Sequence, residues 1–283
     1  MKQSEIFIIG SNGQLGTALR AQYLGARTAD IDELDITNPA SIDKFNWDGI
    51  KIILNAAAYT NVDGAETPEG RVAAWKVNVT ALSYIAKICL KNDITLLHLS
   101  SDYVFDGSAE VHTEEESFGP LGVYGQTKAA GDAIVSVLPK HYVVRTSWVI
   151  GSGQNFVRSI YGLGQRSISP KVVADQFGRL TFTDELVRVI DHLLVNNLPY
   201  GTYNVTNDGP VGSWADIARC VYEYAGYKDL TVGDTTAEEY FAGKISSPRP
   251  VYSTLDMTKL HATGFKSRDW KDNLKEYIEK DLK

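Results

Sequence analysis

The stretch IFIIGSNGQLG, residues 6–16, decides the fold of this chain. Its first four residues are a continuous apolar run, which is typical of a strand buried on both faces of a parallel sheet. Glycines follow at positions 10, 13 and 16 and lead into a helical pattern. Glycine lets the chain turn tightly and lets a pyrophosphate approach the N–H groups at a helix N-terminus. In this context the stretch favours a dinucleotide-binding turn over an ordinary strand-to-helix turn.

Apolar runs and helical periods alternate through the first half of the chain. The predicted strands cover residues 6–9, 27–31, 51–55, 94–101 and 142–150. The longest predicted helices between them cover residues 69–92 and 124–137. This alternation predicts an α/β fold with a doubly wound parallel sheet of the Rossmann type over residues 1–150. Residues 151–283 are less regular, and we expect a smaller α/β lobe there, although the chain can cross between the lobes more than once.

Composition excludes several classes of protein. The 283 residues include 28 Lys and Arg against 35 Asp and Glu, a net charge of −7, which argues against broad nucleic-acid binding. The two cysteines, Cys89 and Cys220, are far apart, so neither a disulfide framework nor a cysteine zinc site is expected. The first apolar run is too short for a signal peptide, and no window approaches the roughly 18 apolar residues of a membrane span. We therefore expect a soluble cytoplasmic protein with no membrane partner.

An acidic residue follows the second predicted strand. Asp30 lies twenty residues after Gly10, where a carboxylate can accept hydrogen bonds from the adenosine ribose hydroxyls. The alternative is a solvated loop acid, since residues 30–33 (DIDE) form an acidic cluster. The same cluster would repel a 2′-phosphate. We therefore predict that the cofactor is NADH or NADPH, with NADH at least as good.

Three polar residues have the pattern of a carbonyl reductase. Ser101 ends the fourth predicted strand, and ligands of open α/β sheets bind beyond the carboxyl ends of the strands. Tyr124 and Lys128 are four residues apart, so they lie on one helix face. A neighbouring ammonium and a cationic nicotinamide would lower the pKa of the phenol from its usual value near 10. The alternative is a surface pair of residues at helical spacing.

Eight strings connect the chain to a known family. They are GSNGQLG (10–16), ELDIT (33–37), NAAAYTNVDGAE (55–66), SSDYVFDG (100–107), YGQTK (124–128), RTSWVIG (145–151), ADQFGRLT (174–181) and RPVYSTLD (249–256). On these strings the chain resembles the extended short-chain dehydrogenase/reductases, and among them the dTDP-4-dehydrorhamnose reductase family. The resemblance runs through most of the chain.

The resemblance implies an activity and a partner. The expected reaction is reduction of the C4 keto group of dTDP-4-dehydro-L-rhamnose (dTDP-6-deoxy-L-lyxo-4-hexulose) by NADH or NADPH, giving dTDP-L-rhamnose. Two alternatives remain: a nucleotide-sugar epimerase of the same superfamily, and a non-catalytic dinucleotide-binding regulatory subunit. The expected partner is a dTDP-sugar, and both a monomer and a homodimer remain open.

The resemblance also implies a role for each site residue. Tyr124 would donate the proton, Lys128 would bind the nicotinamide ribose and lower the pKa of the tyrosine, and Ser101 would replace the threonine usual in the family. The implied cofactor-binding residues, besides Tyr124 and Lys128, are Gly10, Asn12, Gly13, Gln14, Leu15, Asp30, Asp35, Ile36, Ala57, Ala58, Tyr59, Thr60 and Leu99.

The implied substrate-binding set adds four residues to Ser101 and Tyr124. They are Asp102, Tyr103, Trp148 and Arg249. Trp148 has an alternative as a core aromatic residue of the fifth strand, and Arg249, expected to face the diphosphate, has one as a solvated arginine before a proline. Ala18 stands where the family often has an acidic residue in the first helix, so we expect no metal site.

Overall fold

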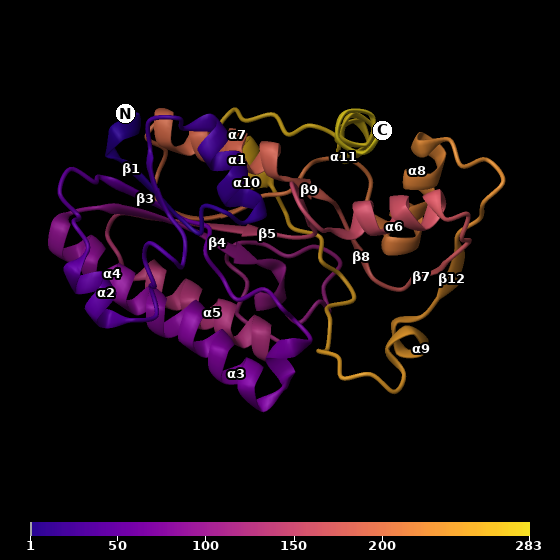
Figure 1. Ribbon diagram of the computed structural model, residues 1–283, viewed down its shortest axis with the longest axis horizontal. Helices are drawn as coiled ribbons and strands as arrows, with labels where there is room; N and C mark the ends of the chain where they lie inside the picture. The colour runs from indigo at the N-terminus through magenta and orange to yellow at the C-terminus, as the bar shows by residue number, and fades with distance from the viewer. Residues whose placement is uncertain (1) are drawn as a thin grey trace.

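A six-stranded parallel sheet forms the centre of the computed structural model, which describes residues 2–283 (Figure 1). The strand order is β10-β5-β4-β3-β1-β2, and every neighbouring pair is parallel. The strands are β1 (Ile6–Ile9), β2 (Arg27–Ala29), β3 (Ile52–Asn55), β4 (Thr95–Ser101), β5 (His141–Thr146) and β10 (Gly201–Asn204). The predicted doubly wound sheet is confirmed.

Helices cover both faces of this sheet (Figure 1). One face carries α1 (Gln14–Gln22), α7 (Thr183–Val195) and α10 (Thr258–His261). The other face carries α2 (Pro39–Lys44), α3 (Pro68–Trp75), α4 (Leu82–Asn92) and α5 (Val123–Ser136). Alternate residues of β1 enter the two cores: Ile6 and Ile8 pack with α1 and α7, whereas Phe7 and Ile9 pack with α4. The continuous apolar run of this strand follows from burial on both faces.

The long helix predicted over residues 69–92 contains a widened turn. Between α3 and α4 lies a π-helical segment, Lys76–Ala81, and the backbone stays helical throughout. Asn78 lies in this segment and is buried. Its Oδ1 accepts from the N–H of Tyr59 at 2.8 Å, and its Nδ2 donates to the Tyr59 carbonyl at 3.2 Å. The widened turn therefore fixes the loop that follows β3, as π segments often do at functional sites.

The strand predicted over residues 142–150 is wrong in its second half. β5 ends at Thr146, and β6 (Val149–Ile150) pairs instead with β9 (Thr181–Phe182), outside the main sheet. Trp148, between the two strands, has a φ of +48°, in the left-handed region that a bulky residue adopts only under constraint. Its ring stacks on Trp214, with 3.7 Å between ring centroids. This stacking holds the chain where it leaves the sheet.

The C-terminal half builds a second cluster and also returns to the sheet. Its remaining strands are β7 (Lys171–Val173), β8 (Phe177–Gly178), β11 (Gly212–Ser213) and β12 (Gly233–Thr235). Its remaining helices are α6 (Phe156–Gln165), α8 (Trp214–Ala225), α9 (Ala237–Phe241) and α11 (Trp270–Tyr277), which continues as the π segment Ile278–Leu282. Because α7 and β10 belong to the main sheet layer, the chain crosses between the two parts. The lobe boundary at residue 150 stays a prediction.

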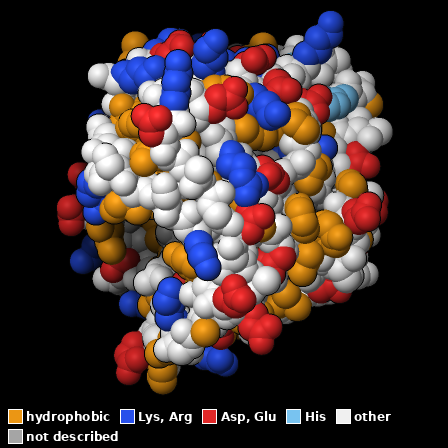
Figure 2. Space-filling view, turned by 90° about the vertical axis from the view of Figure 1, so that its right-hand side faces the viewer, with side chains coloured by type: hydrophobic (Ala, Val, Ile, Leu, Met, Phe, Trp, Pro, Cys, Tyr) orange, Lys and Arg blue, Asp and Glu red, His pale blue; other side chains and the backbone are white. Residues whose placement is uncertain are grey.

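The surface at the end formed by α8, β12 and α9 carries charges of both signs. Lysine and arginine side chains are interspersed with aspartate and glutamate on this face (Figure 2). Within residues 2–283, none of the helices combines the length and apolar character that crossing a bilayer requires.

At the glycine turn after β1, three backbone segments lie very close together. Gly10 has a φ of +75°, and a Cβ on it would lie 2.5 Å from the backbone nitrogen of Ala57. A Cβ on Gly16 would lie 2.1 Å from the carbonyl oxygen of Gly10. The turn can pack between β1, β3 and α1 only because these positions lack side chains.

Gly16→Ala therefore should lower the free energy of unfolding by about 1–3 kcal/mol, the usual cost of overpacking. Gly13→Ala is the matched control, because its Cβ would meet only the Gly10 carbonyl oxygen at an ordinary 3.5 Å. Urea unfolding of both variants measures the difference. Equal stability of Gly16→Ala and wild type would contradict the close packing of the turn.

Candidate active site

A groove of about 340 Å³ lies over the carboxyl ends of β1 and β3. The chain runs from β1 to one face of the sheet and from β3 to the other, and such a switch point is where α/β sheets bind ligands. Eight of the predicted cofactor residues line it: Gly10, Gly13, Asp30, Asp35, Ile36, Ala57, Ala58 and Tyr59. The structure thus brings the glycine turn, the residues after β2 and the end of β3 together.

The other predicted cofactor residues lie around this groove in different settings. The Asn12 N–H donates to Asp30 Oδ2 at 2.8 Å. Gln14 Oε1 accepts from the Gly151 N–H at 2.8 Å, which links α1 to the segment after β6. The Leu15 side chain is buried in the core, so only its backbone can serve a ligand. Thr60 is exposed.

Two carboxylates shape the loop after β2. Besides the Asn12 N–H, Asp30 accepts from the Ile31 N–H at 2.9 Å, so its carboxylate connects this loop to the glycine turn. Asp35 Oδ1 accepts from both the N–H and the hydroxyl of Thr37. The Thr37 hydroxyl contributes most to lowering the pKa of Asp35. Both residues therefore place carboxylate acceptors at one end of the groove.

Lys128 is buried at the base of the site, with only 2% of its surface exposed. Its Nζ donates to the Leu99 carbonyl at 2.7 Å and lies 3.3 Å from His98 Nε2. Burial lowers the pKa of Lys128 to about 8, although the Asp132 carboxylate opposes this change. The lysine therefore exchanges its proton much closer to neutral pH than an exposed lysine does.

Tyr124 lies one helical turn before Lys128 on α5, and its hydroxyl lies beside Ser101. Burial raises the pKa of Tyr124 to about 12, the Ser101 hydroxyl lowers it, and Asp102 and Asp132 raise it further. Lowering of this pKa by Lys128 and a bound nicotinamide stays a prediction, whereas burial has the largest effect in the chain alone. The phenol therefore keeps its proton, which is the form that a proton donor needs.

Ser101 and its neighbours form a small polar network at the end of β4. Ser101 Oγ donates to Asp102 Oδ1 at 3.0 Å and accepts from the Tyr103 N–H at 3.2 Å. Asp102 is 3% exposed, and burial raises its pKa to about 6 despite hydrogen bonds from Ser253 and Ser101. The Tyr103 ring meets Tyr124 edge-on at 5.6 Å between centroids. A ligand in the site therefore reaches Tyr103 and Tyr124 more readily than Asp102.

Arg249 is already paired within the chain. Its Nη2 lies 2.8 and 2.9 Å from the two carboxylate oxygens of Asp63, and its Nη1 donates to the Ser247 carbonyl at 3.0 Å. Its guanidinium also packs over the Phe241 ring at 4.2 Å. The arginine is thus held rather than solvated. Its contact with a diphosphate stays a prediction, as does contact of Trp148 with a sugar.

Several positioning residues were missed by the sequence analysis. Asp132 on α5 pairs with Arg145 on β5, with 2.9 Å between Oδ2 and Nε, and both side chains are buried. Glu66 Oε1 accepts from the Val123 N–H at 2.8 Å and so meets the N-terminus of α5. The sequence could have indicated such residues only where a polar residue interrupts an apolar strand, as Arg145 does in HYVVRT and His98 in TLLHLSS.

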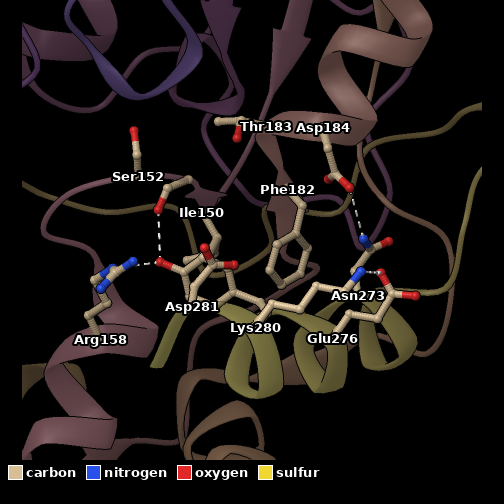
Figure 3. A pocket seen from close by; sticks show the side chains of 12 residues that line it. Ile150, Ser152, Arg158, Phe182, Thr183, Asp184, Asn273, Glu276, Lys280 and Asp281 are labelled. Atoms are coloured by element: carbon tan, nitrogen blue, oxygen red, sulfur yellow. Dashed lines mark hydrogen bonds and ion pairs between the residues drawn. The ribbon is translucent and has the colours of Figure 1, made fainter. Parts of the chain in front are cut away.

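A second pocket, of about 260 Å³, lies among α6, α7 and α11 (Figure 3). Arg158 and Lys280 enter it together with acidic side chains such as Asp184 and Glu276. The Tyr277 hydroxyl at its wall donates to the Gly151 carbonyl and accepts from Arg158 Nε, each at 2.8 Å. These groups bind one another, and none of the predicted site residues lines this pocket. The groove over β1 and β3 is the better candidate.

Comparison with known proteins decides the family. The family model described as "RmlD substrate binding domain" matches residues 4–282. The chain belongs to this family. A dTDP-4-dehydrorhamnose reductase of Aggregatibacter actinomycetemcomitans is 34% identical, over 96% of this chain and 97% of that protein. A probable dTDP-4,6-dihydroxy-2-methyloxan-3-one 4-ketoreductase of Streptomyces antibioticus is also 34% identical, over 95% and 92% of the two chains.

Solved structures of the RmlD family superpose closely on this chain. A dTDP-4-dehydrorhamnose reductase from Clostridium acetobutylicum has a TM-score of 0.89 and 37% identity, over 97% of this chain and 98% of that one. The enzyme of the same name from Bacillus anthracis, in complex with NADP, has a TM-score of 0.88 and 33% identity, over 96% and 98%. The fold of these relatives is therefore shared along the whole chain.

Removal of the Tyr124 hydroxyl tests its role directly. We expect Tyr124→Phe to lower kcat by about 10²–10⁴-fold, the usual contribution of general acid catalysis, with little change in cofactor affinity. Tyr59→Phe is the matched control, since it removes a phenol that lines the groove instead. Steady-state kinetics and a cofactor titration measure both quantities. An unchanged kcat would remove Tyr124 from the mechanism.

Substitution of either residue of the Arg249–Asp63 pair tests the role of the arginine, and the two substitutions should affect the KM differently. Arg249→Ala should raise the KM for the sugar nucleotide roughly 10- to 100-fold, since a hydrogen bond to a charged group contributes about 1.5–3 kcal/mol. Asp63→Asn frees the arginine from its counter-charge and should leave this KM unchanged or lower. A loss confined to kcat in Arg249→Ala would contradict a binding role.

Proposed function

We propose that this protein reduces the C4 keto group of dTDP-4-dehydro-L-rhamnose to a hydroxyl, with NADH or NADPH as the reductant and dTDP-L-rhamnose as the product. The observation that carries the proposal is that Tyr124, which lies beside Ser101 and one turn before Lys128, packs against the same small core cluster as the groove residue Tyr59. It is supported by near full-length similarity to several dTDP-4-dehydrorhamnose reductases.

The groove fits a dinucleotide. A Cβ at Gly10 would fill the space where the turn approaches Ala57, so a side chain is excluded at this position. The N–H groups at the start of α1, after Gly13, face the place where a pyrophosphate is bound in this type of fold. Asp30 would receive the adenosine ribose, and Lys128 the nicotinamide ribose. When bound, the cofactor supplies a hydride to C4.

Tyr124 supplies the proton that completes the reduction. The C4–O double bond becomes a single bond as C4 gains the hydride, and the oxygen takes the hydrogen of the Tyr124 hydroxyl. Tyr124 is left as a phenolate and regains a proton from solvent by way of Lys128. The Ser101 hydroxyl, beside the phenol, orients the keto oxygen toward it. The high pKa of Tyr124 in the chain keeps its hydroxyl protonated until this transfer.

The side chains at the substrate end of the site have functional groups that suit a nucleotide sugar. Tyr103 and Tyr124 offer ring edges and hydroxyls to a deoxysugar. Arg249 is the arginine of the strap formed by residues 246–250, and a guanidinium fork matches phosphate oxygens. We assign the diphosphate to this arginine and the sugar to Tyr103 and Trp148.

The decisive assay follows oxidation of NADH or NADPH with enzymatically generated dTDP-4-dehydro-L-rhamnose. We expect stoichiometric cofactor oxidation and dTDP-L-rhamnose as the product by NMR. A UDP-linked analogue tests the base, and a second dTDP-4-keto sugar tests the sugar, since one relative is named for a different 4-ketoreductase activity. Tightly retained NAD with no net oxidation would indicate an epimerase. Cofactor binding without any turnover would indicate a regulatory subunit.

The same assay tests cofactor choice. Asp30 lines the groove and is half-buried, and Asp32 and Glu33 near it are exposed, so kcat/KM for NADH should at least equal that for NADPH. A ratio that strongly favours NADPH would contradict the role assigned to Asp30.

A further inference from the structure

A file of buried polar groups runs beneath the active site from β3 to Lys128. The Ala57 N–H donates to Asn55 Oδ1 at 3.2 Å, and Asn55 Nδ2 lies 3.0 Å from His98 Nδ1. His98 Nε2 in turn lies 3.3 Å from Lys128 Nζ. Asn55 and His98 are register partners on neighbouring strands, and each is at most 3% exposed. No residue of the mechanism described above explains this file.

The direction of each hydrogen bond follows from the donor at one end. A backbone N–H can only donate, so the Ala57 N–H fixes Oδ1 as the acceptor and turns the Asn55 amide nitrogen toward His98. That nitrogen is also only a donor, so His98 Nδ1 must accept. A neutral imidazole then carries its hydrogen on Nε2 and points it at Lys128 Nζ.

An ammonium cannot accept this hydrogen, but an amine can. With Lys128 as an amine, every group in the file is satisfied. With Lys128 as an ammonium, two donors face each other, or the imidazole and the Asn55 amide must both turn over and leave the Ala57 N–H without its acceptor. The file therefore opposes protonation of Lys128.

We infer that Asn55 and His98 are positioning residues that hold Lys128 toward its amine form by presenting the imidazole N–H to Nζ. This inference rests on the proposed function of the same site. In that reaction a weakly basic lysine releases its proton readily to the Tyr124 phenolate, which restores the phenol for the next turnover. The proton moves from Nζ to the phenolate oxygen, and solvent supplies it to Nζ.

The other groups around Lys128 do not remove this effect. Asp132 on α5 favours the ammonium, but Arg145 on β5 already pairs with its Oδ2 at 2.9 Å. Tyr124 on the same helix is a neutral phenol, and the Leu99 carbonyl on β4 accepts from an amine as well as from an ammonium. Burial holds the pKa of His98 well below its usual range, which keeps the imidazole neutral whichever form Lys128 takes.

The first measurement uses the wild-type protein without ligands. Nitrogen-15 NMR of the histidine side chains distinguishes the two neutral tautomers, and the His98 signals are assigned by their loss in His98→Gln. We expect the hydrogen of His98 on Nε2. A hydrogen on Nδ1 would overturn the inference, because Nε2 would then be a free acceptor for an ammonium.

The second measurement reverses the file without removing a contact. In Asn55→Asp the carboxylate still accepts from the Ala57 N–H, but it draws the imidazole hydrogen to Nδ1 and leaves Nε2 as an acceptor facing Nζ. The titration midpoint of Lys128, followed by carbon-13 NMR of its Cε, should rise by about one pH unit or more. Asn196→Asp, at the exposed residue that follows α7, is the matched control and should leave this midpoint unchanged.

Kinetics give a third readout that also separates this inference from the proposed function. kcat should fall as pH rises through the Lys128 midpoint, about 8 in the wild type, and Asn55→Asp should move this fall to higher pH with little change in KM. A switched tautomer with an unmoved Lys128 midpoint would overturn the inference. Because both NMR measurements need no substrate, a failure of the dTDP-sugar assay alone would count against the proposed function only.

Discussion

The bond from Lys128 Nζ to the Leu99 carbonyl, 2.7 Å long and buried, is the interaction on which the site depends. A buried ammonium or amine without a partner costs several kcal/mol, so this carbonyl fixes the position of α5 against the end of β4. Tyr124 lies one turn earlier on the same helix and therefore meets Ser101, which follows Leu99 on the same strand. This one hydrogen bond thus aligns Tyr124, the proposed proton donor, with Ser101, the residue proposed to orient the substrate.

Buried polar side chains do the remaining alignment, and each has its partner on a different element. Asp132 and Arg145 join α5 to β5, Asn78 joins the π segment to the loop after β3, and Glu66 meets the N-terminus of α5. Such groups are costly unless their hydrogen bonds are complete, so they fix one arrangement of the elements rather than merely adding stability. The parallel sheet is the rigid frame that carries these elements.

Local patterns in the sequence were enough for the sheet, the glycine turn and the spacing of Tyr124 and Lys128, because each depends on residues within one or two turns of each other. They were not enough for the break after Thr146, because the left-handed Trp148 is held by Trp214, far away in the sequence. They also missed the Arg249–Asp63 pair and the Asn55–His98 file, whose partners meet only after folding. The lowering of the tyrosine pKa by Lys128 and a bound nicotinamide stays a prediction; within the chain alone, burial has the largest effect and raises this pKa.

The most direct test of the central claim is a crystal structure of the protein with cofactor and dTDP-L-rhamnose bound together. The account predicts the Tyr124 hydroxyl at hydrogen-bond distance, about 2.6–3.2 Å, from the C4 oxygen of the sugar, with Lys128 still bound to the Leu99 carbonyl. A C4 oxygen held by another side chain, with Tyr124 well beyond that distance, would contradict it.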